Sequence, residues 1–186
     1  MANPLPECII FIGGTLCILY VSRVSLLRPA SHGFYRFFAW EFLLVLFLLN
    51  MRKWLDEPFA PNQLVAWPLL TIALFLIIES ASRLSSQGAS SGARGDDSLI
   101  SFEKTTRLVT KGIYHYIRHP MYSSLLFLGW GIFFKNPSWF GAVLATAASV
   151  FLALTAGIEE GENIRFFGVP YQEYMKRTKM FVPFIF

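Results

Sequence analysis

The feature that most restricts this chain is its series of long apolar stretches. A helix that crosses a bilayer needs about 20 mostly apolar residues, because hydrocarbon offers its backbone no other hydrogen-bond partners. Five stretches approach this length, and the last is free of charged residues over a full membrane width. They span residues 8–22, 34–51, 64–82, 121–134 and 136–158. We therefore predict an all-α, multi-pass membrane protein with about five transmembrane helices.

The composition agrees with this prediction. Charged residues make up 15% of the chain, against roughly 25% in globular proteins. The net charge of +4 does not indicate nucleic acid as a partner, because the basic residues lie near the ends of apolar stretches. Cys8 and Cys17 fall inside the first stretch, where thiols behave as small apolar groups and no metal-ligand spacing exists. Glu7 at the start of this stretch favours a retained helix over a cleaved signal peptide.

The distribution of basic residues predicts an orientation, because Lys and Arg near helix ends favour the cytosolic side. The proposed external side receives Arg52, Lys53 and Lys135, the first two offset by nearby carboxylates. The proposed cytosolic side receives thirteen basic residues: Arg23, Arg28, Arg36, Arg83, Arg94, Lys104, Arg107, Lys111, Arg118, Arg165, Lys176, Arg177 and Lys179. We predict an external amino terminus and a cytosolic carboxyl terminus.

Two features organise the chain as a single membrane domain. Residues 85–98 are rich in Ser and Gly, which predicts a flexible linker between helices 1–3 (residues 1–84) and a carboxyl-terminal core (residues 99–186). Only Lys135-Asn136-Pro137 separates the last two apolar stretches, which predicts a tight antiparallel helical hairpin. The hairpin brings Arg118-His119-Pro120 close to Glu159-Glu160.

These two polar groups have both a structural and a functional interpretation. Aromatic and basic residues favour the headgroup region, so the segment around Arg118 is also typical of an interfacial belt. Glu159 and Glu160 are expected at the carboxyl end of the last apolar helix, where a carboxylate opposes the helix dipole. A compensating cation is then needed, from Arg118, from His119 or from a ligand.

The sequence resembles a known family, the integral membrane methyltransferases related to isoprenylcysteine carboxyl methyltransferase, whose carboxyl-terminal half is shared with membrane phospholipid methyltransferases. The resemblance runs from about Leu108 to Pro183. Its motifs are Leu108-Val109, Gly112-Ile113-Tyr114, Arg118-His119-Pro120-Met121-Tyr122, Glu159-Glu160, Phe167-Gly168, Tyr171, Tyr174 and Phe181-Val182-Pro183.

The resemblance implies S-adenosylmethionine as methyl donor, a cytosolic pocket closed by the segment after the last apolar stretch, and no metal. It also implies an acceptor that enters from the bilayer. A carboxylate would hold the donor's ammonium group, a cation its carboxylate, and aromatic rings its adenine and sulfonium. The implied donor contacts are Thr106, Arg107, Leu108, Val109, Tyr114, Arg118, His119, Pro120, Met121, Tyr122 and Glu159, with Glu160 as a weaker candidate.

The acceptor is less well defined. The carboxyl methyltransferases carry an arginine one helical turn before the Glu-Glu pair, and Thr155 stands here instead. A tryptophan that the family often has after the third helix is also missing, which favours a neutral, amine or thiol acceptor over prenylcysteine. Thr155, Glu41 and Glu79 are weak substrate candidates, the two glutamates because carboxylates in membrane helices are often functional. Glu79 can alternatively pair with Arg83, and Glu41 is expected to lie close enough to a helix end to reach the interface.

Three functions therefore stay open. The first is a methyltransferase of the isoprenylcysteine carboxyl type, acting on a lipophilic acceptor at the cytosolic membrane face. The second is an N-methyltransferase of ethanolamine-type phospholipids, or a methyltransferase of small thiols or amines. The third is a non-catalytic membrane scaffold of the same fold. No dedicated catalytic base is assigned, because aligning donor and acceptor and excluding water can supply most of the catalysis.

Overall fold

The computed structural model describes residues 4–88 and 105–184. Within these ranges the chain forms six α-helices and two 3-10 turns, without a β-strand. The helices are α1 (Leu5–Leu26), α2 (His32–Asn50), α3 (Pro61–Gln87), α4 (Pro120–Lys135), α5 (Trp139–Phe167) and α6 (Val169–Arg177), and the turns are η1 (Met51–Lys53) and η2 (Gly112–His115). The prediction of an all-α fold is confirmed.

Four of the described helices are long and apolar enough to cross a membrane: α1, α2 extended by η1, α3 and α5. Helix α4 is shorter, because its 16 residues reach only about 24 Å, against a hydrocarbon core of about 30 Å. The number of five membrane crossings and their orientation stay predictions. Helix α6 was not predicted as a helix, because its nine residues are polar and too short to give an apolar stretch.

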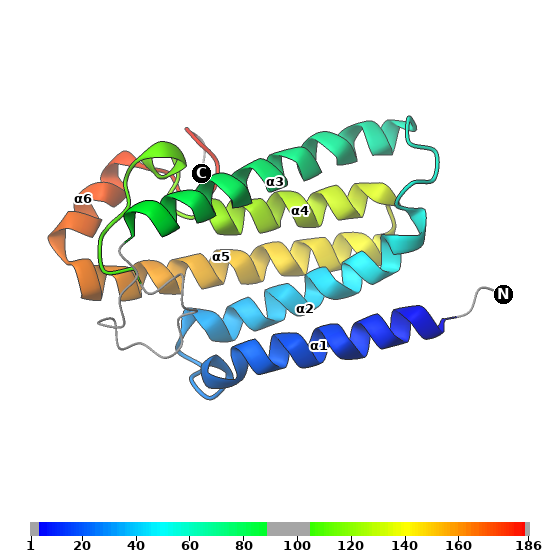
Figure 1. Ribbon diagram of the computed structural model, residues 1–186, viewed down its shortest axis with the longest axis horizontal. Helices are drawn as coiled ribbons and strands as arrows, with labels where there is room; N and C mark the ends of the chain where they lie inside the picture. Colours follow the sequence, from blue (N-terminus) through cyan, green and yellow to red (C-terminus); the bar gives the residue numbers. More distant parts are fainter. Residues whose placement is uncertain (1–3, 89–104, 185–186) are drawn as a thin grey trace.

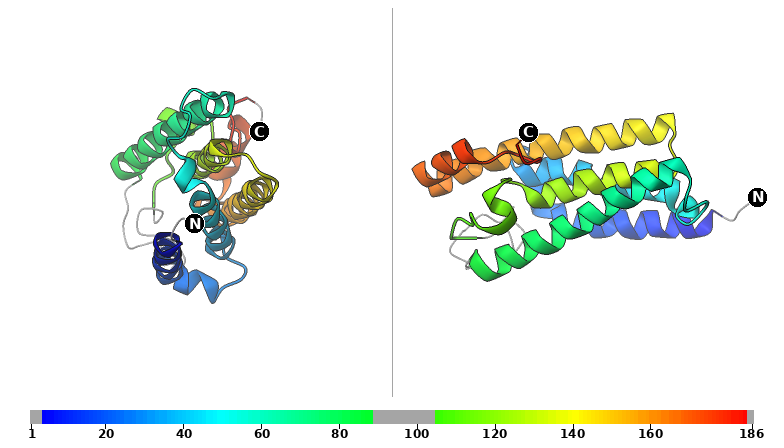
Figure 2. Two further views of the ribbon diagram at one scale, coloured as in Figure 1. Left: turned by 90° about the vertical axis from the view of Figure 1, so that its right-hand side faces the viewer. Right: turned by 90° about the horizontal axis from the view of Figure 1, so that it is seen from above.

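The long helices form an elongated bundle in which α3 packs on α4, α2 on α5 and α1 on the outer side of α2 (Figures 1 and 2). Helices α4 and α5 form the predicted antiparallel hairpin. One end of the bundle holds the α1–α2 turn, the end of α3, the start of α4 and the end of α5 with α6 (Figure 1). These segments and the chain between α3 and α4 carry the basic residues predicted to face the cytosol, except Arg94 and Lys104, which lie outside the described residues. The other end holds the amino terminus and the α2–α3 and α4–α5 connections.

Two helices end later than the sequence predicted. Helix α3 continues through Gln87, three residues into the predicted linker, and residues 89–98 of that linker lie outside the described residues. Helix α5 continues to Phe167, where Gly168 adopts a positive φ of 67° and ends it. Glu159 and Glu160 therefore lie two turns before the end of α5, and the expectation that they oppose its dipole is wrong. Apolar periodicity missed this extension, because its residues are polar but still favour a helix.

A carboxyl-terminal strap, residues 178–184, crosses the start of α4. Lys179 donates its backbone N–H to the Tyr116 carbonyl, Arg118 donates to the Lys179 carbonyl and His119 donates to the Met180 carbonyl. Ile117 and Lys179 form an isolated parallel bridge. The strap thus fixes the backbone of the Arg118-His119 motif.

Candidate active site

His119 lies at the centre of the polar cluster where α4 begins. It is the N-cap of α4, and Pro120 in the first helical position presets the backbone of the first turn. Its side chain is only 3% exposed, with Nε2 3.4 Å from Glu160 Oε1 and Nδ1 3.9 Å from Glu159 Oε2. The imidazole also stacks on the Tyr122 ring, with centroids 5.5 Å apart. The predicted approach of the Arg118 segment to the Glu-Glu pair is confirmed.

Arg118 and Glu160 form a buried ion pair. Arg118 Nε donates to Glu160 Oε1 over 2.6 Å, and the two side chains are each 11% exposed. Arg118 Nη1 also donates to the carbonyls of Met175, over 3.3 Å, and Thr178. One guanidinium thus joins α4, α5, α6 and the strap. Removal of either partner would leave an uncompensated charge in the protein, at a cost of about 3–5 kcal/mol.

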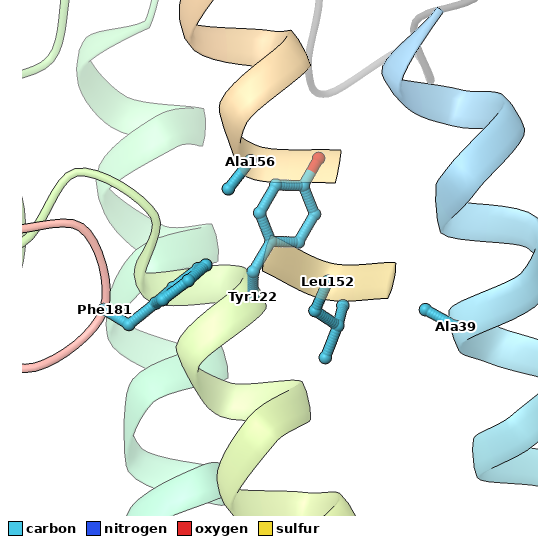
Figure 3. Close-up of a cluster of buried hydrophobic side chains, with 5 residues drawn as sticks. All are labelled: Ala39, Tyr122, Leu152, Ala156 and Phe181. Atoms are coloured by element: carbon cyan, nitrogen blue, oxygen red, sulfur yellow. The ribbon is translucent and has the colours of Figure 1, made fainter. Parts of the chain in front are cut away.

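Glu159 has different surroundings from its neighbour. Its Oε2 accepts a 2.5 Å hydrogen bond from the Tyr122 hydroxyl, and its Oε1 lies 3.5 Å from Asn163 Nδ2. Figure 3 shows Tyr122 reaching from α4 to α5 beside Ala156. Among the described residues, the nearest basic group is His119, and no Lys or Arg lies within 4 Å of the Glu159 carboxylate. The charge of Glu159 is therefore available to a cationic ligand.

A cavity opens on this cluster between the ends of α3 and α5, the start of α4 and helix α6. Its lining includes every predicted donor contact except Thr106, Arg107 and Glu160. Arg107 is exposed, and Glu160 is turned toward Arg118 instead. The lining residues are Leu84, Thr105, Leu108, Val109, Tyr114, Arg118, His119, Pro120, Met121, Tyr122, Glu159, Asn163, Phe167, Tyr171 and Tyr174.

Six lining residues were not predicted as site residues: Leu84, Thr105, Asn163, Phe167, Tyr171 and Tyr174. Phe167 stacks on Tyr171, and the Tyr171 ring meets Tyr174 edge to face. The Tyr174 hydroxyl donates to the Tyr114 carbonyl over 2.6 Å, which ties α6 to η2. Burial raises the pKa of both tyrosines, and the Glu159 carboxylate raises that of Tyr171 further. The spacing of Phe167, Tyr171 and Tyr174 by four and three residues could have identified this aromatic wall.

The three weaker substrate candidates do not line this cavity. Glu79 accepts from Arg83 Nε over 2.7 Å, which confirms the predicted pair. Glu41 accepts from the Thr15 hydroxyl over 3.0 Å and lies midway along α2 rather than near its end, so its predicted position is wrong. Thr155 is fully buried and donates to the Phe151 carbonyl over 2.7 Å.

The side chains that line the cavity supply carboxylate, imidazole, guanidinium and aromatic groups. In the part of the chain that the structure describes, no three His, Cys, Asp or Glu side chains are grouped to hold a metal ion. The arrangement suits a ligand that carries a cation for Glu159 and a flat ring for the aromatic wall.

A comparison with known families covers every residue that lines the cavity. The profile of the family described as "Phospholipid methyltransferase" matches residues 62–176. The chain is 37% identical to protein-S-isoprenylcysteine O-methyltransferase B of Arabidopsis thaliana over 90 residues, which are 46% of this chain and 44% of the relative. It is 29% identical to methanethiol S-methyltransferase of Crocosphaera subtropica over 79 residues, 41% of this chain and 29% of the relative. The matches thus span less than half of each relative. No solved structure matches the chain.

Proposed function

This chain belongs to the phospholipid methyltransferase family, and from that premise we propose that it transfers a methyl group from S-adenosylmethionine to a lipophilic acceptor. The observation that carries the proposal is the position of Glu159 in the cavity wall, without a Lys or Arg partner among the described residues. In the orientation we propose, this cavity faces the cytosol and the long apolar helices lie in the membrane.

The cavity residues fit the chemical groups of the donor. Glu159, oriented by Tyr122 and Asn163, would hold an ammonium group. His119 and Arg118 line the same cavity and would meet a carboxylate. The rings of Phe167, Tyr171 and Tyr174 would flank an adenine or a sulfonium. Glu160 would act indirectly, by holding Arg118 in position.

The reaction needs alignment more than proton transfer. The acceptor's lone pair forms a bond to the methyl carbon, the bond from that carbon to the donor's sulfur breaks, and the positive sulfur becomes a neutral thioether. The chain's contribution is to hold the two molecules in line and exclude water. Tyr171 and Tyr174 of α6 form part of the cavity wall, which supports this role.

Two acceptor classes compete within this proposal. The Arabidopsis relative is named for isoprenylcysteine and an oxygen acceptor, and the cyanobacterial relative for methanethiol. Thr155, where the carboxyl methyltransferases carry arginine, is buried and bonded to Phe151, so it offers no cation to a carboxylate. This favours an amine, thiol or neutral acceptor, and a prenylcysteine carboxylate is the second candidate.

Donor binding is tested first, with the purified full chain in detergent. S-adenosylmethionine or S-adenosylhomocysteine should raise its melting temperature, because a ligand of the folded state stabilises that state. Glu159→Ala should abolish the rise, and Glu173→Gln, an exposed change on α6, should preserve it. Absence of a rise in the wild type would favour the non-catalytic scaffold.

The acceptor is tested by methyl transfer from a radiolabelled donor. Phosphatidylethanolamine, a long-chain thiol and a prenylcysteine analogue are offered separately. We expect label in the amine or the thiol. Efficient labelling of the prenylcysteine carboxylate would refute the argument from Thr155, while leaving the donor site unchanged.

A further inference from the structure

A second polar cavity lies at the end of the bundle opposite the donor cavity. It is bounded by the α2–α3 connection, the first turn of α3 and the turn between α4 and α5. Its lining residues are Lys53, Asp56, Glu57, Ala60, Asn62, Gln63, Lys135 and Asn136, all polar except Ala60. Methyl transfer as proposed above uses none of them.

Lys135, the last residue of α4, is the unusual member of this lining. Its side chain is 2% exposed, and Nζ donates to Gln63 Oε1 over 2.8 Å. The ammonium also lies 3.1 Å from the centroid of the Trp67 ring and 5.3 Å from that of Trp54. Among the described residues, no carboxylate lies within 4 Å of Nζ. A buried ammonium without a counter-ion is costly, and an anion in the adjoining cavity would reduce that cost.

The partner of Lys135 is held rigidly. Gln63 Nε2 lies within hydrogen-bonding distance of the carbonyls of Lys53, Asp56 and Lys135, at 3.5, 3.2 and 3.2 Å. This fixes its Oε1 toward the ammonium. Helix α3 also begins here without a side-chain cap, so the partial positive charge of its first turn adds to that of Lys135. The inner part of the cavity therefore favours a negative group.

The outer part of the cavity has the opposite preference. Lys53 is paired with Asp56 at 2.9 Å, and both are exposed. Glu57 is exposed, and among the described residues it has no ion-pair partner. Besides the Lys53–Asp56 pair, the lining carries one buried positive charge, at Lys135, and one exposed negative charge, at Glu57. A ligand that balances both carries an anion and a cation.

The position of the cavity indicates where such a ligand comes from. It lies at the ends of the long apolar helices, together with Trp54, Trp67 and Trp139, which is 89% exposed. Tryptophan favours the interface between hydrocarbon and water, the level at which lipid phosphates lie.

We propose that this cavity binds the headgroup of a zwitterionic phospholipid, with the phosphate against Lys135 and the headgroup ammonium against Glu57. The site is separate from the donor cavity and serves as a fixed lipid contact of the α2–α3 and α4–α5 connections. The chemistry it recognises is a phosphate next to an ammonium group.

Native mass spectrometry of the full chain in lipid-free detergent tests the proposal by titration with three probes. These are phosphatidylethanolamine, diacylglycerol of the same acyl chains, and inorganic phosphate as a competitor. We expect a retained phosphatidylethanolamine whose binding depends on Lys135, besides any bound as acceptor at the donor cavity, and little diacylglycerol. Lys135→Met should weaken phospholipid binding roughly tenfold or more, because a hydrogen bond from a charged group is lost. Lys176→Met, the same substitution on the exposed face of α6, should leave it unchanged.

The other outcomes are equally decisive. Equal retention of diacylglycerol, or unchanged phospholipid binding in Lys135→Met, would overturn the proposal. Displacement of the lipid by millimolar inorganic phosphate would assign the cavity to a free anion and overturn the headgroup assignment. Glu57→Gln should shift the preference from phosphatidylethanolamine to phosphatidylglycerol. If Lys135→Met does not fold, the melting temperature of the wild type is the test. Phosphatidylcholine, which is zwitterionic but has no amine left to methylate, should raise it well above the rise that diacylglycerol gives. Equal rises would overturn the proposal.

Discussion

The two ends of the bundle each bury a cation, and they do so in different ways. At the donor end, Arg118 is neutralised by Glu160 and also bonds two carbonyls. At the opposite end, Lys135 meets an amide oxygen and two aromatic rings, without a carboxylate among the described residues. The comparison teaches that a buried cation paired with a carboxylate holds helices together even where it also lines a cavity, whereas a buried cation without a carboxylate needs an anionic ligand to balance it.

The largest effect is expected from Arg118→Met. This change leaves Glu160 with His119 in place of its arginine partner, and it frees two carbonyls of α6 and the strap. We predict a loss of about 3–5 kcal/mol in the free energy of unfolding, the usual cost of breaking a buried pair. Chemical denaturation in detergent measures this loss. Arg118→Lys keeps the charge but lacks the planar guanidinium, so it should recover only part of the lost free energy of unfolding. An unchanged midpoint would mean that the pair does not support the fold.

A smaller effect is expected from Lys135→Met in phospholipid-free detergent. Here no carboxylate is left behind, and the losses are one hydrogen bond to Gln63 and the contact with Trp67. We predict a cost of about 1–2 kcal/mol in the same denaturation experiment. A cost as large as that of Arg118→Met would remove the difference between the two ends.

The smallest effect concerns Tyr174, whose hydroxyl bonds the Tyr114 carbonyl. Tyr174→Phe should cost about 1 kcal/mol at neutral pH, because one buried hydrogen bond is lost. Burial raises the pKa of Tyr174 above its ordinary value of 10.0. Its stabilising contribution is therefore complete below pH 10 and is lost as the pH rises above 10, when the unfolded tyrosine ionises. Melting temperatures between pH 8 and 11 should fall less steeply in Tyr174→Phe than in the wild type.

Much of the fold and the core of the candidate site followed from the sequence. The apolar stretches predicted helices, and the short Lys135-Asn136-Pro137 connection predicted the hairpin that joins the Arg118 segment to Glu159 and Glu160. These predictions succeeded because they depend on local patterns, namely apolar length and loop length.

The different roles of Glu159 and Glu160 were predicted only in part. Glu160 was the weaker donor contact, but its pairing with Arg118 was not predicted. The two residues are adjacent and chemically identical, and their roles depend on which face of α5 meets Arg118 and which meets the cavity. Helix α6, which lines the cavity, and the strap, which holds the Arg118-His119 backbone, are likewise positioned by contacts with distant residues such as Tyr116 and Arg118. The midway position of Glu41 in α2 also depends on where that helix begins and ends.

The most direct test of the donor site is the equilibrium binding of labelled S-adenosylhomocysteine to the wild type, Glu159→Gln and Glu173→Gln. The substitution at Glu159 removes the charge but keeps the shape, and the one at Glu173 removes a similar charge from the surface of α6. We predict at least roughly tenfold weaker binding for Glu159→Gln, from the loss of a charge-assisted hydrogen bond, and unchanged binding for Glu173→Gln. Equal affinity in all three proteins would contradict the assignment of Glu159 to the donor.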